Sequence, residues 1–181
     1  MSNIWFCSDT HFGHDRDFIW QPRGFNNVYE MNKAIIKNWN SVIQKDDIVY
    51  HLGDLMLGDN QEGLKCVHQL NGIIYLCIGN HDTDSRIKLY KNCYNIANVQ
   101  FAYRLKIGHK SFYLSHYPTM IGNLDENIKV WNICGHSHTK NKYQDMQYKI
   151  YHAELDCHNN FPVSLEEVKI DINNYIRKSI K

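Results

Sequence analysis

The sequence predicts an α/β fold built around a largely parallel sheet. Three short apolar runs alternate with segments of helical periodicity, in the order strand, helix, strand, helix, strand. Strands joined by helices in this way pair in parallel through right-handed crossovers. Each run also ends in a short polar loop, and in open α/β sheets ligands bind beyond the carboxyl ends of the strands.

The first half of the chain supplies these elements. Strands are expected at residues 4–8, 48–52 and 73–78, and helices at residues 29–42 and 61–70. Met31, Ile35 and Trp39 give the first helix its apolar face, because they recur at helical spacing. The second helix ends at Asn71-Gly72, where glycine suits a C-cap.

The order of elements changes in the second half. We expect a short helix at residues 84–90, strands at 99–107, 110–114, 131–134 and 148–152, and a closing helix at 165–176. Gly108-His109 separates the first two of these strands, which is typical of a hairpin turn. The closing helix competes with a strand, because residues 168–172 also alternate.

The composition describes an ordinary globular chain, with 43% hydrophobic and 22% charged residues. A net charge of +1 argues against a basic groove for extended nucleic acid. No run approaches the roughly 18 apolar residues of a membrane span, and no secretory leader precedes the first strand. We therefore expect one cytoplasmic domain over residues 1–181, without membrane association and with its cysteines reduced.

Polar side chains gather at the ends of the expected strands. They occur in Asp9-Thr10-His11, Gly53-Asp54, Gly79-Asn80-His81-Asp82, Ser115-His116 and Gly135-His136-Ser137-His138. Oxygen and nitrogen donors without cysteine form a ligand set for two divalent ions of the Mn, Fe, Zn or Ni kind. A shared carboxylate can hold such ions roughly 3.5–4 Å apart, where a bridging water is acidified and a phosphoryl group is clamped. The pattern therefore favours hydrolysis of a phosphate ester.

In order and content these segments resemble the five-block signature of the calcineurin-like metallophosphoesterases. The resemblance spans the chain from Asp9 to His138, with every metal position filled. The small size and the loop after Asp9 resemble the compact bacterial and phage members. The resemblance to this family implies a two-sheet α/β sandwich flanked by helices, with a dinuclear metal site at the C-terminal edge of the strands.

The resemblance also implies a role for each matched residue. The first ion would be held by Asp9, His11 and His138, the second by Asn80, His116 and His136, with Asp54 bridging them. A metal-bound hydroxide would attack phosphorus without a phosphoenzyme, and manganese is the ion we expect first. His81 would assist the leaving group, and Asp82 would orient the His81 ring.

The substrate is expected to be a small phosphate ester. We favour a phosphodiester such as a nucleotide or cyclic nucleotide, because an acid is retained at His81 and many aromatic residues could stack a base. His14, Arg16 and Arg23 lie on the loop after Asp9 and are expected to contact the substrate, although the arginines could equally form surface ion pairs. A phosphomonoesterase and a nuclease remain alternatives on the same site.

A non-catalytic metal-binding scaffold also stays open, because fold alone does not fix function. The complete ligand set argues against it. Five further histidines are interpreted as structural, namely His51, His68, His109, His152 and His158. Asp156, ahead of Asn159-Asn160 and Pro162, is interpreted as part of a turn.

Overall fold

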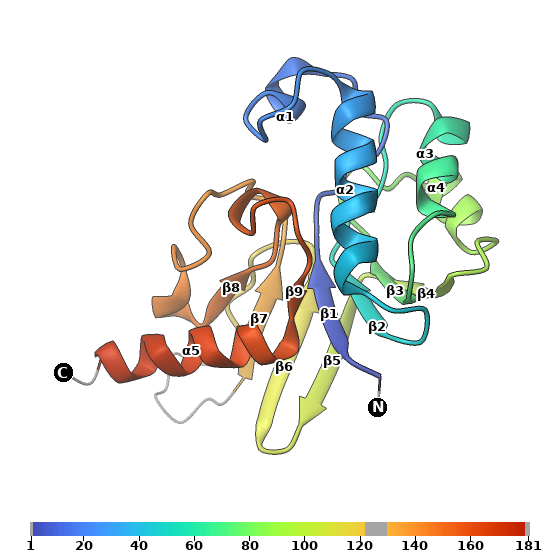
Figure 1. The fold of residues 1–181 in the computed structure, drawn as a ribbon. Helices are drawn as coiled ribbons and strands as arrows, with labels where there is room; N and C mark the ends of the chain where they lie inside the picture. The colour runs from blue at the N-terminus through green and yellow to red at the C-terminus, as the bar shows by residue number, and fades with distance from the viewer. Residues whose placement is uncertain (1, 122–129, 180–181) are drawn as a thin grey trace.

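Two β-sheets pack against each other in the computed structural model, which describes residues 2–121 and 130–179 (Figure 1). The first sheet contains β1 (Ile4–Cys7), β2 (Ile48–His51), β3 (Ile73–Cys77), β4 (Ile96–Gln100) and β9 (Val163–Ser164), in the order β4-β3-β2-β1-β9. The second contains β5 (Ala102–Ile107), β6 (Lys110–Ser115), β7 (Val130–Cys134) and β8 (Ile150–His152), in the order β5-β6-β7-β8.

The strand directions confirm the predicted α/β fold. β1, β2, β3 and β4 pair in parallel, and only β9 joins this sheet antiparallel, beside β1. In the second sheet β5 and β6 form the expected hairpin, whereas β6, β7 and β8 run parallel. β1 and β7 point toward the same end of the molecule (Figure 1), so loops from both sheets meet at one edge.

The α-helices are α1 (Asp17–Trp20), α2 (Val28–Val42), α3 (Asn60–Val67), α4 (Asp84–Tyr90) and α5 (Leu165–Ser179), and the 3-10 helices are η1 (Met146–Tyr148) and η2 (Leu155–Cys157). Helices α2, α3 and α4 cover the outer face of the first sheet, whereas α5 packs into the core between the sheets. α2 begins where the Asn27 side chain accepts a hydrogen bond from the Glu30 N–H. Asp59 caps α3 in the same way, accepting from the N–H groups of Gln61 and Glu62.

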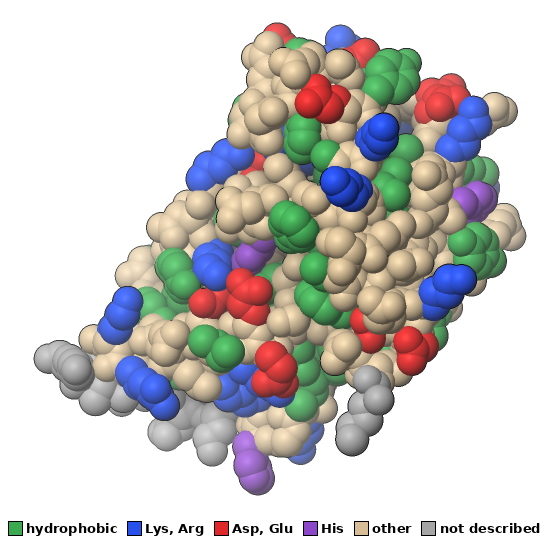
Figure 2. Space-filling view, viewed as in Figure 1, with side chains coloured by type: hydrophobic (Ala, Val, Ile, Leu, Met, Phe, Trp, Pro, Cys, Tyr) green, Lys and Arg blue, Asp and Glu red, His purple; other side chains and the backbone are tan. Residues whose placement is uncertain are grey.

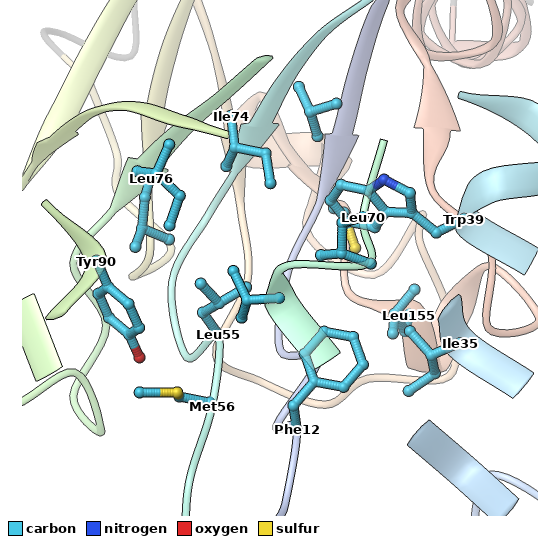
Figure 3. Close-up of a cluster of buried hydrophobic side chains, with 14 of the residues drawn as sticks. Phe12, Ile35, Trp39, Leu55, Met56, Leu70, Ile74, Leu76, Tyr90 and Leu155 are labelled. Atoms are coloured by element: carbon cyan, nitrogen blue, oxygen red, sulfur yellow. The ribbon is translucent and has the colours of Figure 1, made fainter. Parts of the chain in front are cut away.

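The two faces of the first sheet lie in separate apolar cores. One core joins the sheet to α2, α3 and α4, and in it Phe12, Ile35 and Leu155 approach from separate elements (Figure 3). The other core lies between the sheets, where Phe6 of β1 and Phe112 of β6 are both fully buried. Burial on both faces explains why the central strands are apolar at most positions.

The predicted strand at residues 99–107 is wrong, because this segment contributes to both sheets. β4 ends at Gln100 against β3, and β5 begins at Ala102 against β6. The exposed Phe101 marks the crossing. No glycine or proline interrupts the alternation there, so the sequence carries no breaker to reveal the change of sheet. α1 and β9 were also missed, because elements this short show no period.

The strand expected from residue 148 begins later. Lys149 adopts a left-handed conformation after η1, so β8 starts at Ile150. On the face in Figure 2 acidic and basic side chains are interspersed, in keeping with the near-neutral net charge. Across the described ranges, no helix has both the length and the apolar character needed to cross a bilayer.

Asp47 anchors the start of the sheet and provides a test of the fold. Its carboxylate accepts hydrogen bonds from Asn3 N–H (2.7 Å), Trp5 Nε1 (3.1 Å) and Gln44 N–H (2.9 Å). Asp47→Ala is expected to lower the free energy of unfolding by about 2–4 kcal/mol at pH 7, because three donors lose a buried acceptor. Urea unfolding measures the loss, with the exposed Asp46→Ala as control.

The Asp47 effect should depend on pH. Burial opposes ionisation of this carboxyl, but the hydrogen bonds from Gln44 and Asn3 outweigh it and lower its pKa. The stabilisation is therefore complete above the unfolded value of about 3.9 and is lost as the pH falls through the lower folded value. A difference between wild type and Asp47→Ala that stays constant down to pH 2 would contradict this assignment.

Candidate metal centre

The five polar segments converge at the shared edge of the two sheets. Loops after β1, β2 and β3 bring Asp9, His11, Asp54 and Asn80, and loops after β6 and β7 bring His116, His136 and His138. Backbone hydrogen bonds hold neighbouring loops together, since Asp9 N–H donates to Gly53 O and His11 N–H donates to Asp54 O, both at 3.1 Å. The convergence follows from parallel strands ending at one edge.

Three ligand atoms form a first cluster around Asp9. His11 Nε2 and His138 Nε2 lie 3.6 and 3.7 Å from Asp9 Oδ1 and 3.1 Å from each other. Atoms bound to one ion at about 2.1 Å lie about 3.0–3.4 Å apart, so these separations suit a single ion. Asp54 Oδ2 lies 3.8 Å from His11 Nε2 and offers a fourth ligand.

A second cluster surrounds Asn80. Its Oδ1 lies 2.8 Å from His116 Nε2 and 2.9 Å from His136 Nδ1. Asp54 Oδ2 lies 3.6 Å from His116 Nε2, so the same oxygen faces both clusters. These residues could hold a second ion, with Asp54 shared between the two.

Hydrogen bonds fix the tautomers of two of the histidines. His116 Nδ1 lies 2.8 Å from Leu52 O, which can only accept, so Nδ1 carries the proton and the Nε2 lone pair faces the cluster. His138 Nδ1 lies 3.0 Å from Asp156 Oδ2, so Nδ1 carries the proton here too and the Nε2 lone pair faces the first cluster. Asp9 Oδ1 is buried and has no hydrogen-bond partner among the described residues. A cation between these groups would satisfy it.

The backbone is strained where the candidate ligands lie. Positive φ angles occur at eight non-glycine residues in the described part of the chain, and five of these are candidate ligands: Asp9, His11, Asp54, His136 and His138. Such conformations cost of order 1–3 kcal/mol each and cluster at functional sites. Gly135 permits the crowding, because a Cβ there would collide with Ser8 Oγ and the Asp9 carboxylate.

Burial keeps several of these imidazoles neutral. It lowers the pKa of His11 and of His136, and it lowers the pKa of His14 to about 4, with the nearby His11 contributing to the last shift. Neutral imidazole is the form that binds metal ions. Only the pKa of His138 is raised among the candidate ligand histidines with a shifted pKa. Burial lowers it, but the Asp156 hydrogen bond and the charges of Asp9 and Asp156 together outweigh burial.

His81 lies at the open side of the clusters. Its side chain is 41% exposed, and Nε2 lies 4.0 Å from Asp54 Oδ2. The His81 N–H donates to Asp54 Oδ1 at 2.8 Å, which fixes the residue relative to the shared carboxylate. Arg86 holds the same loop by donating to the His81 carbonyl at 2.7 Å.

Asp82 has a different role from the one expected. Its carboxylate accepts hydrogen bonds from Asp54 N–H (2.8 Å), Gly79 N–H (2.9 Å) and Tyr90 Oη (2.9 Å), and none from the His81 ring. The expectation that Asp82 orients His81 is therefore corrected. Asp82 instead joins the two loops that carry Asp54 and Asn80, because main-chain N–H groups, rather than the neighbouring ring, point toward it.

The three loop residues expected to contact substrate are placed differently from one another. His14 lines the pocket above the clusters, next to His11. Arg16 is exposed and lines a neighbouring groove. The Arg23 side chain is fully buried behind the clusters, which corrects its expected contact with substrate, because no part of the guanidinium reaches the pocket.

A pocket of about 560 Å³ opens over the clusters. Asp54, several other candidate ligands and His81 line it. Phe18, Ile19, Pro22 and Leu57 also line it and are called the apolar wall here, and Phe18 is 64% exposed. The pocket therefore combines polar candidate ligands with an apolar wall.

Two residues from outside the five segments, Asp156 and Lys140, also line this pocket, and sequence reasoning missed the role of Asp156. Asp156 was interpreted as part of a turn, and it does lie in the short helix η2, but its carboxylate contacts His138, Arg23 and Lys140. The only local signal is an acidic residue between the apolar Leu155 and Cys157. The five histidines interpreted as structural line neither this pocket nor the clusters.

Fold and site together define a metallophosphoesterase: a two-sheet α/β sandwich with aspartate, asparagine and histidine donors clustered at its strand ends. Residues 2–172 match the family model for calcineurin-like phosphoesterase, and the chain belongs to this family.

Relatives are found among archaeal and bacterial proteins. An uncharacterized protein of Methanocaldococcus jannaschii is 34% identical over 176 residues, covering 92% of this chain and 89% of the relative. A solved protein of unknown function from Aquifex aeolicus superposes with a TM-score of 0.73 and 25% identity, covering 93% of this chain and 98% of that one. A solved archaeal phosphodiesterase superposes with a TM-score of 0.53 and 19% identity, covering 84% and 83%, and shows the shared fold alone.

Proposed function

We propose that this phosphoesterase binds two divalent ions and hydrolyses a phosphodiester. The first ion is held by Asp9, His11 and His138, the second by Asn80, His116 and His136, and both by Asp54. The observation that carries the proposal is the position of Asp54 Oδ2, within 4 Å of histidine nitrogens from both clusters. The three oxygen donors suit manganese and the four imidazoles suit Fe, Zn or Ni, and manganese is the ion we propose first.

The bound ions would supply an acidified water and neutralise charge on the phosphoryl group. The chain itself supplies the positioning. Asp54 orients both clusters and, through the hydrogen bond from the His81 N–H, fixes the distance of His81 from them. Asp82 holds the two loops in register by accepting from Asp54 N–H and Gly79 N–H.

His81 is proposed to protonate the leaving alkoxide. Its partly exposed side chain lines the pocket, and Nε2 lies 4.0 Å from Asp54 Oδ2, so it can reach an oxygen of a phosphate bound over the clusters. Arg86 supports this role by anchoring the His81 carbonyl and, through Nε, the Asn60 side chain at 3.1 Å.

The pocket favours a diester over a monoester. Lys140 is the only lysine or arginine lining it within the described ranges, and its Nζ is engaged with Pro22 O and Asp156 Oδ1. A monoester dianion would therefore find little positive side-chain charge to balance its second negative charge. A diester monoanion instead carries a second organic group that the apolar wall can bind. The exposed Phe18 could stack the base of a nucleotide or cyclic nucleotide.

Hydrolysis of two model substrates tests the proposal. Bis-p-nitrophenyl phosphate and p-nitrophenyl phosphate are compared with added Mn²⁺ and after chelation. We expect metal-dependent cleavage that is faster for the diester and is reduced in His81→Ala. Cleavage of the monoester alone would reverse the diester assignment, and cleavage that survives complete chelation would contradict the metal mechanism. Intact metal binding with no hydrolysis of either substrate, or of nucleotide diesters, would favour a scaffold.

Phe18→Ala tests the apolar wall. Loss of an aromatic contact of about 0.5–1.5 kcal/mol should raise KM for bis-p-nitrophenyl phosphate about 2- to 10-fold, with kcat and metal content nearly unchanged. Phe101→Ala is the matched control, because Phe101 is also exposed but lies outside the pocket. Equal KM values for Phe18→Ala and wild type would remove Phe18 from the substrate site.

A further inference from the structure

A buried ion pair lies directly behind the candidate metal centre. Arg23 Nη2 donates to Asp156 Oδ2 at 2.7 Å, and Nε donates to Oδ1 at 3.2 Å, so the pair is bidentate. The Arg23 side chain is fully buried and that of Asp156 is 5% exposed. The two residues are 133 positions apart in the sequence, so the pair joins distant segments.

Both members of the pair also contact the candidate ligands of the first ion. Arg23 Nη2 donates to the Asp9 carbonyl at 2.7 Å, and Nη1 donates to the Thr10 carbonyl at 3.4 Å. On the other side, His138 Nδ1 donates to Asp156 Oδ2 at 3.0 Å. The pair thus connects the loop after β1 with the loop after β7.

Stability alone gives a poor explanation for this pair. Transferring the two charged groups from water to the interior costs several kcal/mol for each ion. Their mutual attraction offsets this cost only when the geometry of the ion pair is good. Buried pairs can often be replaced by apolar residues without loss of stability. What the pair does provide is a fixed orientation for the atoms it touches, which include the Asp9 carbonyl and His138 Nδ1.

We propose that Arg23 and Asp156 are positioning residues that set the affinity of the first metal ion. Asp156 holds the His138 ring so that Nε2 faces Asp9 Oδ1 and His11 Nε2. Arg23 holds the carbonyl of Asp9, whose φ of 57° lies in the strained left-handed region. This inference rests on the proposed dinuclear function and adds a support that the five segments do not contain.

The proposal predicts an effect on one ion only. In the second cluster, His116 is oriented by the Leu52 carbonyl, and Asn80 contacts His116. Neither contact involves Arg23 or Asp156. Residues that orient ligand histidines typically contribute 10- to 100-fold to metal affinity. Loss of the Asp156 charge should therefore weaken one site and leave the other unchanged.

Calorimetric titration of the metal-free protein with Mn²⁺ tests this prediction. Asp156→Asn keeps the size of the side chain, and we expect one of two sites to weaken about 10- to 100-fold while the other keeps its wild-type affinity. Asp171→Asn is the matched control, because Asp171 is also buried and accepts from Tyr151 Oη at 2.7 Å, away from the pocket. The control should keep both affinities.

A second variant keeps the test decisive if Asp156→Asn fails to fold. Arg23→Lys keeps the charge but cannot make the bidentate contact, and it should weaken the same site as Asp156→Asn. Two wild-type affinities in both variants, or equal weakening of both sites, would overturn the positioning role and leave the proposed function standing. Failure of the wild-type protein to bind two ions would instead overturn the proposed function itself.

Discussion

Asp54→Asn is expected to abolish turnover and tight binding of two ions together. Asp54 Oδ2 lies 3.8 Å from His11 Nε2 and 3.6 Å from His116 Nε2, so one charge serves both clusters. Asparagine keeps the shape and can still accept the hydrogen bond from His81 N–H, but it removes the charge. We expect kcat/KM to fall about a thousandfold or more, because the transition state loses several kcal/mol of stabilisation by the metal ions.

Metal content and hydrolysis are measured on the same preparation of Asp54→Asn. Asp46→Asn provides the control, because Asp46 is exposed and remote from the pocket. A variant that retains two ions and full activity would exclude Asp54 as the shared ligand.

His81→Ala is expected to separate chemistry from metal binding. His81 contacts the shared carboxylate through its backbone, and the side chain itself is 41% exposed above the clusters. The variant should keep both ions and lose about 10²- to 10⁴-fold in kcat for esters with poor leaving groups. The loss should shrink for p-nitrophenolate, because a good leaving group needs less help from a proton donor.

A series of diesters with leaving groups of increasing pKa measures this dependence in wild type and His81→Ala. His109→Ala is the control, because His109 is exposed at the turn of the β5–β6 hairpin. An equal loss for every leaving group would argue that His81 binds the phosphate and does not donate a proton.

The parallel pairing of the first three strands and the convergence of the seven candidate ligands could be predicted from the sequence. Parallel strands end at one edge, so polar residues placed after apolar runs must meet there, as Asp9 and Asp54 do. Helix α4 was predicted with its observed bounds, Asp84–Tyr90. Such features can be predicted because hydrophobic periodicity and the position of a strand end are local properties of the sequence.

Features that depend on distant partners could not be predicted. Asp82 follows His81 in sequence, yet its carboxylate turns to the N–H groups of Asp54 and Gly79. Arg23 and Asp156 meet only because two loops from separate sheets come together behind the ligands. The crossing at Phe101 is equally invisible, because alternation continues through it.

Hydrolysis of bis-p-nitrophenyl phosphate as a function of Mn²⁺ bound per chain tests the central claim most directly. The dinuclear account predicts that two ions bind and that the rate rises with occupancy of the second site. Full activity with one ion bound, or with none, would contradict it.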